Sequence, residues 1–403
     1  MPDNAFLRFL IAAPLLLAIA SCNSPPLTAE AFDWQSYDNP PMDTRPLVRW
    51  WWPGADVDPS ELARELDVLA AQGFGGAEIQ AFNAALEPVE GEALSKRLDY
   101  DSPRFWTLVQ GVASAAQASS LRIDLNLGTG WSTGGPHIDV ADSMQTLLWG
   151  EAVVNGPATV DLPLTGPEQT PFYMLAEIAA DIGEPLARDL TSTAKLVAVI
   201  AGKETGGRRD RDNDYNLQDT VQLDPKTLVE LTSFVEDGKL HWDAPDGKWR
   251  VVSLWQAPDG QYISLPAYNQ PSFVVDHLNQ QRVLDNLNHL LRDETGLTPY
   301  FADPIKGIFI DSFEMVTERH YTDDFFAKFQ EFRGYDIKPY LPFVMNPGAD
   351  NHLFDGAGIK TRSPFSLSET SDQVPFVSER LHHDYSLTVS DLFIERFFET
   401  TEE

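Results

Sequence analysis

The sequence predicts an α/β fold: a (β/α)8 TIM barrel, incomplete at the C-terminus and interrupted by an inserted β-rich subdomain. Short apolar strands alternate with amphipathic helices over residues 46–145. Over 146–273 that rhythm gives way to alternating strands separated by turn residues, without a long amphipathic helix. The rhythm resumes over 274–403 and leaves only half the strands of a barrel. We therefore expect a parallel sheet with helices outside it and an antiparallel insertion.

Each barrel element has a local reason in the sequence. Leu47–Trp52 is a short apolar strand, and the helix after it starts at the N-cap Asp58, with Pro59 at its first position. Gly73 closes that helix, because glycine accepts the left-handed conformation at a helix C-terminus. The other barrel elements expected are strands over 75–82, 121–127 and 307–310 and helices over 102–120, 277–292, 323–334 and 378–399. In the insertion, strands are expected over 195–200 and 249–255.

Three aspartates of the insertion, Asp210, Asp212 and Asp214, recur at alternate positions, as at the start of an EF-hand calcium loop. The rest of that pattern fails, because Tyr215 stands where glycine is required and Val221 where glutamate is required. A solvated charged loop is the better interpretation. The residues by themselves leave any metal ligands unknown.

The N-terminus predicts an exported lipoprotein. The apolar run of residues 6–20 is too short to span a bilayer and is typical of a signal peptide. It ends in Ile19-Ala20-Ser21-Cys22, which resembles a bacterial lipobox with Cys22 as the lipidated residue. We expect a signal peptide over 1–22, a tether over 23–45, and a lipid anchor that holds the protein to a membrane. The expected location is the outer membrane, on its periplasmic or surface face.

The chain is strongly acidic, with 61 Asp and Glu against 29 Lys and Arg and a formal net charge of −32. Phosphate binding needs a basic face, so nucleic acid is excluded as a partner. Cys22 is the only cysteine, which excludes a disulfide framework. A hydrophobic content of 43% indicates a folded globular chain.

Polar and aromatic residues gather where the expected parallel strands end. In a (β/α)8 barrel this face carries the active site. Flat indole rings with an N–H donor suit the face of a sugar. The expected substrate-binding residues are Arg49, Trp51, Trp52, Glu78, Gln80, Asn126 and Trp131. Buried packing is the alternative for the tryptophan run 50–52, since a strand covered on both faces would also accept it.

Two carboxyl groups follow the strand expected over 307–310. Glu314 stands just past an apolar strand, where partial desolvation raises a carboxyl pKa and keeps the group protonated as a general acid. Asp311 is expected to orient a partner, to bind a ligand, or only to cap the strand end. The glycine-rich loop around Trp131 lacks the G-x-G-x-x-G spacing and the P-loop lysine, so a sugar platform is favoured over a phosphate site.

The runs 45–54, 75–80, 127–135 and 311–314 together resemble glycoside hydrolase family 106, whose members are α-L-rhamnosidases. The resemblance spans roughly Pro46 to the C-terminus. It implies a (β/α)8 catalytic barrel, calcium as a cofactor, and inverting hydrolysis of terminal α-L-rhamnosyl linkages in oligo- or polysaccharides. It also implies that Glu314 is the first catalytic glutamate, the acid, and that the second lies beyond residue 403. The chain would then be the N-terminal part of a longer enzyme.

Two other functions stay open. A barrel glycosidase of another specificity would share the aromatic and carboxylate cluster and act on other glycosides. A non-catalytic carbohydrate-binding surface lipoprotein would need only the aromatic residues. Competing catalytic motifs are absent: His382-His383 lacks the H-E-x-x-H spacing, and no G-x-S-x-G elbow occurs.

Overall fold

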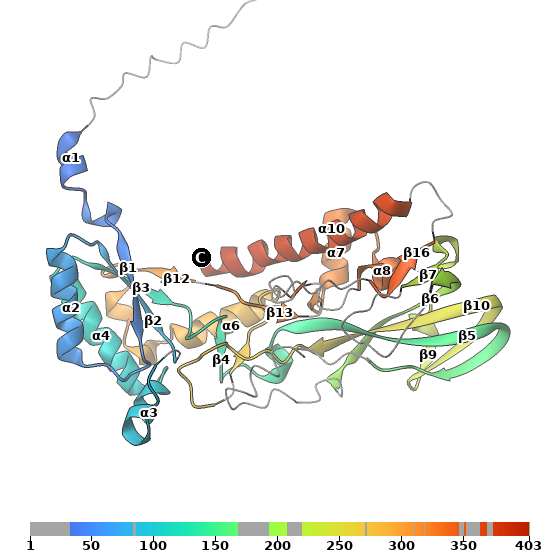
Figure 1. Cartoon of the computed structure of the whole chain (residues 1–403), viewed down its shortest axis with the longest axis horizontal. Coiled ribbons are helices and arrows are strands. Elements are labelled where there is room, and N and C mark those ends of the chain that lie inside the picture. Colours follow the sequence, from blue (N-terminus) through green and yellow to red (C-terminus); the bar gives the residue numbers. More distant parts are fainter. Residues whose placement is uncertain are drawn as a thin grey trace, which may run out of the picture.

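The computed structural model describes residues 33–83, 86–167, 193–207, 220–270, 272–310, 312–317, 319–345, 350–351, 363–368 and 374–402. The predicted signal peptide and the lipidation site Cys22, the aspartates Asp210, Asp212 and Asp214, and Asp311 lie outside these ranges. The described residues form an elongated molecule, with a small parallel sheet at one end and a long antiparallel sheet at the other (Figure 1). None of their helices is both long enough and apolar enough to cross a membrane.

The parallel sheet has four strands in the order β1-β2-β3-β12. Their bounds are Leu47–Trp52 for β1, Gly76–Ala81 for β2, Arg122–Asn126 for β3 and Ile305–Phe309 for β12. All neighbouring pairs are parallel, so the carboxyl ends of the strands meet at one edge. The sequence predicted each of these strands to within two residues.

Three helices cover one face of this sheet: α2 (Pro59–Ala71), α4 (Pro103–Ala118) and α6 (Gln280–Leu290). Each starts at a side chain that accepts a hydrogen bond from a backbone N–H group of the first turn, from Asp58, Ser102 and Asn279 respectively. Such caps replace partners that the first turn of a helix lacks. A short helix, α3 (Gly91–Arg97), follows β2 and was not predicted.

The core of this half lies between the sheet and the three helices. Leu66 of α2, Val109 of α4 and Val283 of α6 are buried in one cluster with alternate strand residues such as Ile79 and Ile123. Each strand therefore gives every second side chain to this core and leaves the others to the opposite face.

The second sheet has eight strands, with the main order β14-β5-β10-β6-β7-β16. The long strands are β5 (Gln145–Pro163), β6 (Lys195–Gly207) and β10 (Lys239–Pro258), and the short ones are β7 (Val221–Leu223), β8 (Val229–Glu230), β9 (Val235–Glu236), β14 (His320–Tyr321) and β16 (Phe365–Leu367). Most lie within the β-rich region expected over 146–273, but β14 and β16 join from later in the chain. The insertion and the residues after it therefore share one sheet.

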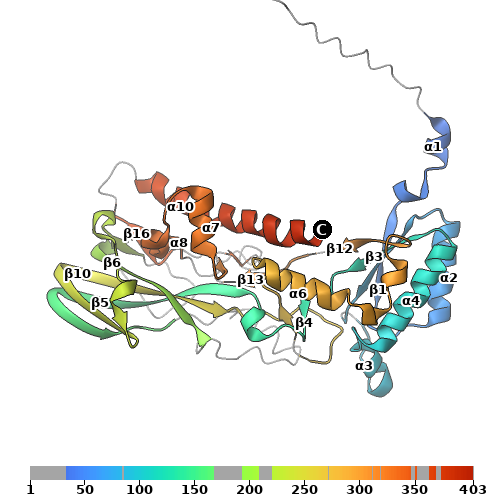
Figure 2. The same cartoon turned by 180° about the vertical axis from the view of Figure 1, so that it is seen from behind.

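Helices from the last part of the chain cover one face of this second sheet, and α10 runs along the length of the molecule (Figures 1 and 2). They are α7 (Phe325–Arg333), α8 (Leu341–Val344) and α10 (Val374–Phe393), whereas α11 (Glu399–Glu402), at the end of the chain, contacts α6. Phe325, Leu341 and Tyr385 pack there against Val252 and Leu254 of β10. The helix expected over 378–399 is interrupted by a π-helical turn, Ile394–Phe398.

The (β/α)8 TIM barrel, expected to be incomplete at the C-terminus, is not confirmed. The described residues supply four parallel strands with helices outside them, which corresponds to a half-barrel, and the remaining mass is the mixed second sheet with its helices. The short elements complete the list: α1 (Trp34–Asp38), β4 (Gly134–Gly135), β11 (Phe273–Val274), β13 (Val316–Thr317) and β15 (Asp350–Asn351).

Candidate active site

The face of the parallel sheet that points away from its helices, here called the inner face, is polar. It carries the side chains that alternate with those of the helix-side core: Arg49, Trp51, Glu78, Gln80, Asp124, Asn126 and Phe309. In register, Arg49 stands beside Glu78, and Glu78 beside Asp124. The structure thus places Arg49, Trp51, Glu78, Gln80 and Asn126 of the predicted substrate-binding set on one face.

The inner face is concave. The outer strands of the sheet are β1 and β12, and three strand spacings would separate them by about 14 Å in a flat sheet. The guanidinium carbon of Arg49 on β1 nevertheless lies 4.6 Å from the centre of the Phe309 ring on β12. The sheet must therefore curl toward its inner face, as the wall of a barrel does.

Gln80 is the residue of the inner face with the clearest unmet bonding capacity. Its side chain is 0% exposed, and neither the amide Oε1 nor the amide Nε2 has a hydrogen-bond partner. Leaving such a group unpaired costs about 1–3 kcal/mol, so buried amides in folded proteins are almost always satisfied. A ligand or an ordered water at this position would complete the hydrogen bonding of Gln80.

The tryptophan run divides between the two faces. Trp50 donates its indole N–H to Glu65 on α2 (2.8 Å), and Trp52 is 1% exposed and packs edge-on against Phe105 of α4. Only Trp51 of the three is on the inner face, where it is 54% exposed. This corrects the expectation for Trp52. Strand alternation sends it to the helix side with Trp50, and it is part of the core.

An aromatic rim extends from Trp51 at the edge where the parallel strands end. The ring of Phe82, directly after β2, lies 5.0 Å from Trp51 and 5.8 Å from Trp131 between ring centres. Phe82 therefore joins the two tryptophans into one surface. Trp131 is half-buried in this surface, so it combines a packing role with an accessible part.

The glycine-rich loop that carries Trp131 is fastened to the end of β2. The Thr129 hydroxyl donates to the carbonyl oxygen of Ala81 (2.6 Å), and the Gly130 N–H donates to the same oxygen (3.2 Å). Gly130 has a φ of +67°, and a Cβ there would lie 2.1 Å from the carbonyl oxygen of Ser264. Glycine is needed at this position because another backbone approaches so closely.

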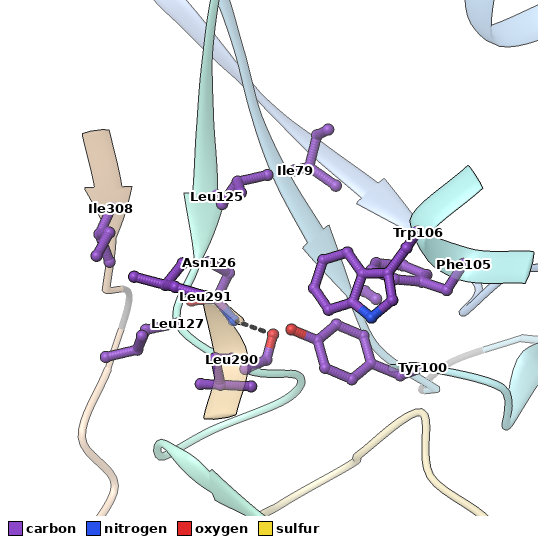
Figure 3. A pocket seen from close by; sticks show the side chains of 12 residues that line it. Ile79, Tyr100, Phe105, Trp106, Leu125, Asn126, Leu127, Leu290, Leu291 and Ile308 are labelled. Carbon is purple, nitrogen blue, oxygen red and sulfur yellow. Dashed lines mark hydrogen bonds between the residues drawn. The ribbon is translucent and has the colours of Figure 1, made fainter. Parts of the chain in front are cut away.

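Asn126 holds the start of this loop. Its side-chain Nδ2 donates to the carbonyl oxygen of Gly128 (3.3 Å), which is the dashed line in Figure 3. The cavity drawn there has a volume of about 20 Å³ and apolar walls that include Leu125 and Trp106. A cavity of this size holds about one water molecule, so it is not a sugar site.

Glu314 follows β12 in a strained backbone conformation. Its φ is +38°, a left-handed value that costs a non-glycine residue on the order of 1–3 kcal/mol unless the surroundings impose it. The buried Gln261 supplies that constraint: its Nε2 donates to the carbonyl oxygen of Glu314 (2.7 Å), and its Oε1 accepts from the N–H of Val316 (3.1 Å). Asp311, the other expected carboxyl group of this segment, lies outside the described residues.

Residues 259–270, here called the crossing segment, connect the loops around this edge. Ser264 and Trp131 exchange backbone hydrogen bonds, Asn83 donates to the carbonyl oxygen of Leu265, and Gln261 holds Glu314. One segment from the end of the β-rich region therefore positions the loop after β2, the loop after β3 and the segment after β12.

The two carboxylates of the inner face, Asp124 and Glu78, differ in their hydrogen bonding. Asp124 accepts two hydrogen bonds from Arg122 (2.7 Å each), so its charge is compensated. Glu78 is half-buried beside it. Among the described residues no three His, Cys, Asp or Glu side chains gather as a metal site, and calcium takes six to eight oxygen ligands. Backbone carbonyls, side-chain amides and waters also serve calcium as ligands, so calcium stays a prediction of the family resemblance.

Sequence reasoning missed Phe82, Thr129 and Gln261. Phe82 is the residue directly after an apolar strand, so its place on the rim could have been inferred. Gln261 could not, because it is separated from Glu314 by 53 positions and from Val316 by 55. No local pattern marks such a contact.

The chain is similar to known proteins in sequence and in fold. A family model described as alpha-L-rhamnosidase, glycoside hydrolase family 106, matches residues 38–215 and 208–347. The solved structure of a rhamnosidase from Novosphingobium sp. PP1Y superposes with a TM-score of 0.61 at 18% identity, over 91% of this chain and 45% of that protein. At that identity the likeness shows a shared fold.

A curated relative from Formosa agariphila, named "Putative beta-glucuronidase", is 26% identical over 409 aligned residues, which are 98% of this chain and 31% of the relative. The chain thus spans less than half the length of either protein. The family model covers most of the chain, including the inner face, the aromatic rim and Glu314, and the chain therefore belongs to glycoside hydrolase family 106.

Proposed function

We propose that this chain provides the sugar-binding face and the general acid of an α-L-rhamnosidase. The observation that carries the proposal is Gln80, a fully buried amide without a partner on a concave polar face. A sugar hydroxyl both donates and accepts hydrogen bonds, so it can satisfy the Oε1 or the Nε2 of Gln80. The half-exposed Trp51 offers a flat apolar surface beside it for the face of the ring.

In this proposal Glu314 protonates the glycosidic oxygen as the C–O bond to the anomeric carbon breaks, and the aglycone leaves as an alcohol. Water attacks the anomeric carbon from the opposite side and loses its proton to a second carboxylate. Inversion requires the two carboxyl groups to be roughly 6.5–9.5 Å apart, which leaves room for that water. Should the 403-residue chain by itself turn over aryl α-L-rhamnosides, the first candidate for the second role among the described residues is Glu78, an inner-face carboxylate without a hydrogen-bonded arginine.

The test is Glu314→Gln in the longest product of the gene. Turnover of natural rhamnosides should fall at least a hundredfold, because general acid catalysis contributes roughly 10²–10⁴. Aryl α-L-rhamnosides with good leaving groups need less protonation and should lose much less. Glu230→Gln, an exposed glutamate on β8 of the second sheet, is the matched control and should change neither rate. Equal losses on both substrate types would refute the acid role.

A β-glucuronidase is the second candidate, and Arg49 favours it. A glucuronide carries a carboxylate, and Arg49 is an exposed cation on the inner face, held over the Phe309 ring. We expect kcat/KM for aryl α-L-rhamnosides to exceed that for aryl β-glucuronides, with Arg49→Met affecting rhamnosides less than tenfold. A preference for glucuronides that Arg49→Met abolishes would establish the second candidate instead.

A further inference from the structure

A second pocket lies outside the inner face and the aromatic rim, between the loop before α4 and the end of α6. Its volume is about 400 Å³, within the range of small-molecule sites. Its walls include Tyr100, Asp101, His137, Tyr268 and His289. It shares no lining residue with the inner face, so an occupant would be separate from a sugar held by Gln80.

Two polar atoms of this pocket's walls are buried without hydrogen-bond partners. They are the hydroxyl of Tyr268, whose side chain is 8% exposed, and the Nδ1 of His137. Both approach the same backbone point: a Cβ on Gly135 would lie 2.7 Å from His137 Nδ1 and 3.2 Å from the Tyr268 hydroxyl. The two atoms therefore lie close enough together for one small polar group to bridge them.

The hydrogen-bond network determines which ring nitrogen of His137 carries the proton. Asn286 donates through Nδ2 to the Thr133 hydroxyl (3.1 Å), which turns its Oδ1 toward His137 Nε2 (2.9 Å). We assign the His137 proton to Nε2 on this basis, so Nδ1 is a lone-pair acceptor. Burial, together with the neighbouring His289, lowers the pKa of His137 to about 4, so the ring is neutral at pH 7.

The charges around the pocket are already compensated. Asp101, at a φ of +65°, accepts hydrogen bonds from His289 Nε2 (2.9 Å), Arg292 (2.8 Å) and the Trp106 indole (2.9 Å). Burial alone would raise the pKa of Asp101, but these hydrogen bonds outweigh burial and hold it below its usual value. His289 in turn stacks on His137 with ring centres 3.7 Å apart. An ionic ligand would therefore find no uncompensated charge here.

We propose that this pocket is a second carbohydrate site, which holds a neutral sugar ring through a hydroxyl that donates to His137 Nδ1 and accepts from Tyr268. A hydroxyl carries both functions in one atom, which matches the acceptor and donor left open. Tyr100 and Tyr268, packed edge to face with ring centres 5.3 Å apart, form an aromatic part of the wall. The site does not take part in hydrolysis and is independent of the acid role of Glu314.

The test measures binding of L-rhamnose, D-galactose and anionic D-galacturonate to the full chain by saturation-transfer NMR and calorimetry. Every protein tested also carries Trp51→Ala, which should weaken sugar binding at the inner face. Adding Tyr268→Phe removes only a hydroxyl that has no protein partner, so the melting temperature should hold while neutral-sugar affinity falls about tenfold. His137→Phe, which removes the acceptor, should cause a similar loss.

Tyr335→Phe is the matched control. It deletes a hydroxyl that donates to Asp384 (3.0 Å), outside the pocket, and should leave binding unchanged. Affinity unaffected by Tyr268→Phe, tighter binding of D-galacturonate than of the neutral sugars, or a sugar-soaked crystal with only a water between the two atoms would each overturn the proposal. Because the readout is binding, loss of turnover in Glu314→Gln has no bearing on it.

Discussion

At the scale of single residues, buried polar atoms without hydrogen-bond partners indicate where a ligand could bind. Gln80 and Tyr268 are buried with polar atoms that no protein group satisfies. Tyr100, which lines the same pocket as Tyr268 and is of the same residue type, shows no such deficit. The deficits mark two places where a ligand hydroxyl would complete the structure.

Gln261 positions Glu314, and we expect its loss to act on catalysis more than on binding. Gln261→Glu replaces the donor to the Glu314 carbonyl with an oxygen, which repels it. In the proposed enzyme kcat should fall at least tenfold with KM within about twofold, since a displaced acid costs transition-state stabilisation. Steady-state kinetics measure the split.

Gln256→Glu is the control for Gln261→Glu, because Gln256 is a buried amide bonded to Gln145 and Asp323, away from Glu314. It should lower the melting temperature without changing kcat of the folded enzyme. A similar fall of kcat in both variants would mean that Gln261 acts only through stability.

His277 should make the protein less stable in acid. Burial among Phe313, Phe393 and Phe397 lowers its pKa to about 3, although Val275 accepts a hydrogen bond from Nδ1. The unfolded chain binds a proton near pH 6.5, so between pH 6.5 and 3 it holds more protons than the folded one. The unfolding free energy should therefore fall with decreasing pH by about 1.4 kcal/mol per unit from this residue.

Urea unfolding of His277→Phe between pH 6 and 4 checks this: the slope against pH should be shallower by about one proton. His241→Gln, an exposed histidine of β10, should leave the slope as it is. A wild-type slope in His277→Phe would show that His277 does not control the acid sensitivity.

At the scale of elements, the last helices are held by one arginine at the π-helical turn. Arg396, 7% exposed, donates to the carbonyl oxygen of Leu278 (2.7 Å) and through two nitrogens to Asp324 (2.7 Å each). Leu278 precedes α6 and Asp324 caps α7, so Arg396 ties both halves of the molecule to the C-terminal helix. A π-turn inserts an extra residue and shifts the direction of the side chains after it.

We expect Arg396→Met to lower the unfolding free energy by about 1–3 kcal/mol, because the Leu278 carbonyl is left buried and unpaired. Arg64→Met breaks an exposed helical pair with Glu61 and should cost much less, because solvent screens that pair. Chemical denaturation of both variants measures the difference. Equal costs would mean that the C-terminal helix is held by its apolar contacts alone.

At the scale of the whole molecule, the described helices α2, α4 and α6 pack against only one side of the parallel sheet, the side opposite its concave polar face. Its outer strands β1 and β12 each have one strand partner there. The curl shown by the contact of Arg49 with Phe309 is nevertheless already present in four strands. The two proteins of known name are both more than twice as long as this chain.

Export and anchoring stay a prediction of the lipobox at Cys22. In the native host we expect the mature protein to begin at an acylated Cys22 and to partition with membranes, because each buried CH2 of an acyl chain contributes about 0.8 kcal/mol. Mass spectrometry of the native N-terminus measures this, and Cys22→Ala should abolish acylation. An unmodified or differently cleaved N-terminus would contradict it.

The sequence by itself determined the parallel strands, the helix starts at Asp58 and Ser102, and the family, because these depend on patterns a few residues long. It also placed Trp51 and Gln80 at a strand end with the correct spacing. It could not choose which side of the strand faces the core, and so it assigned Trp52 to the site.

Only the tertiary structure decided which residues far apart in the sequence come into contact. The hydrogen bonds of Gln261 to the Glu314 segment, the contact of Arg49 with Phe309 and the approach of Tyr268 to Gly135 join segments that no periodicity relates. The membership of the second sheet had the same cause: the later strands β14 and β16 pair with strands of the insertion, as backbone groups bond wherever a complementary edge is near. Local propensity defines elements, and burial and edge pairing decide which of them meet.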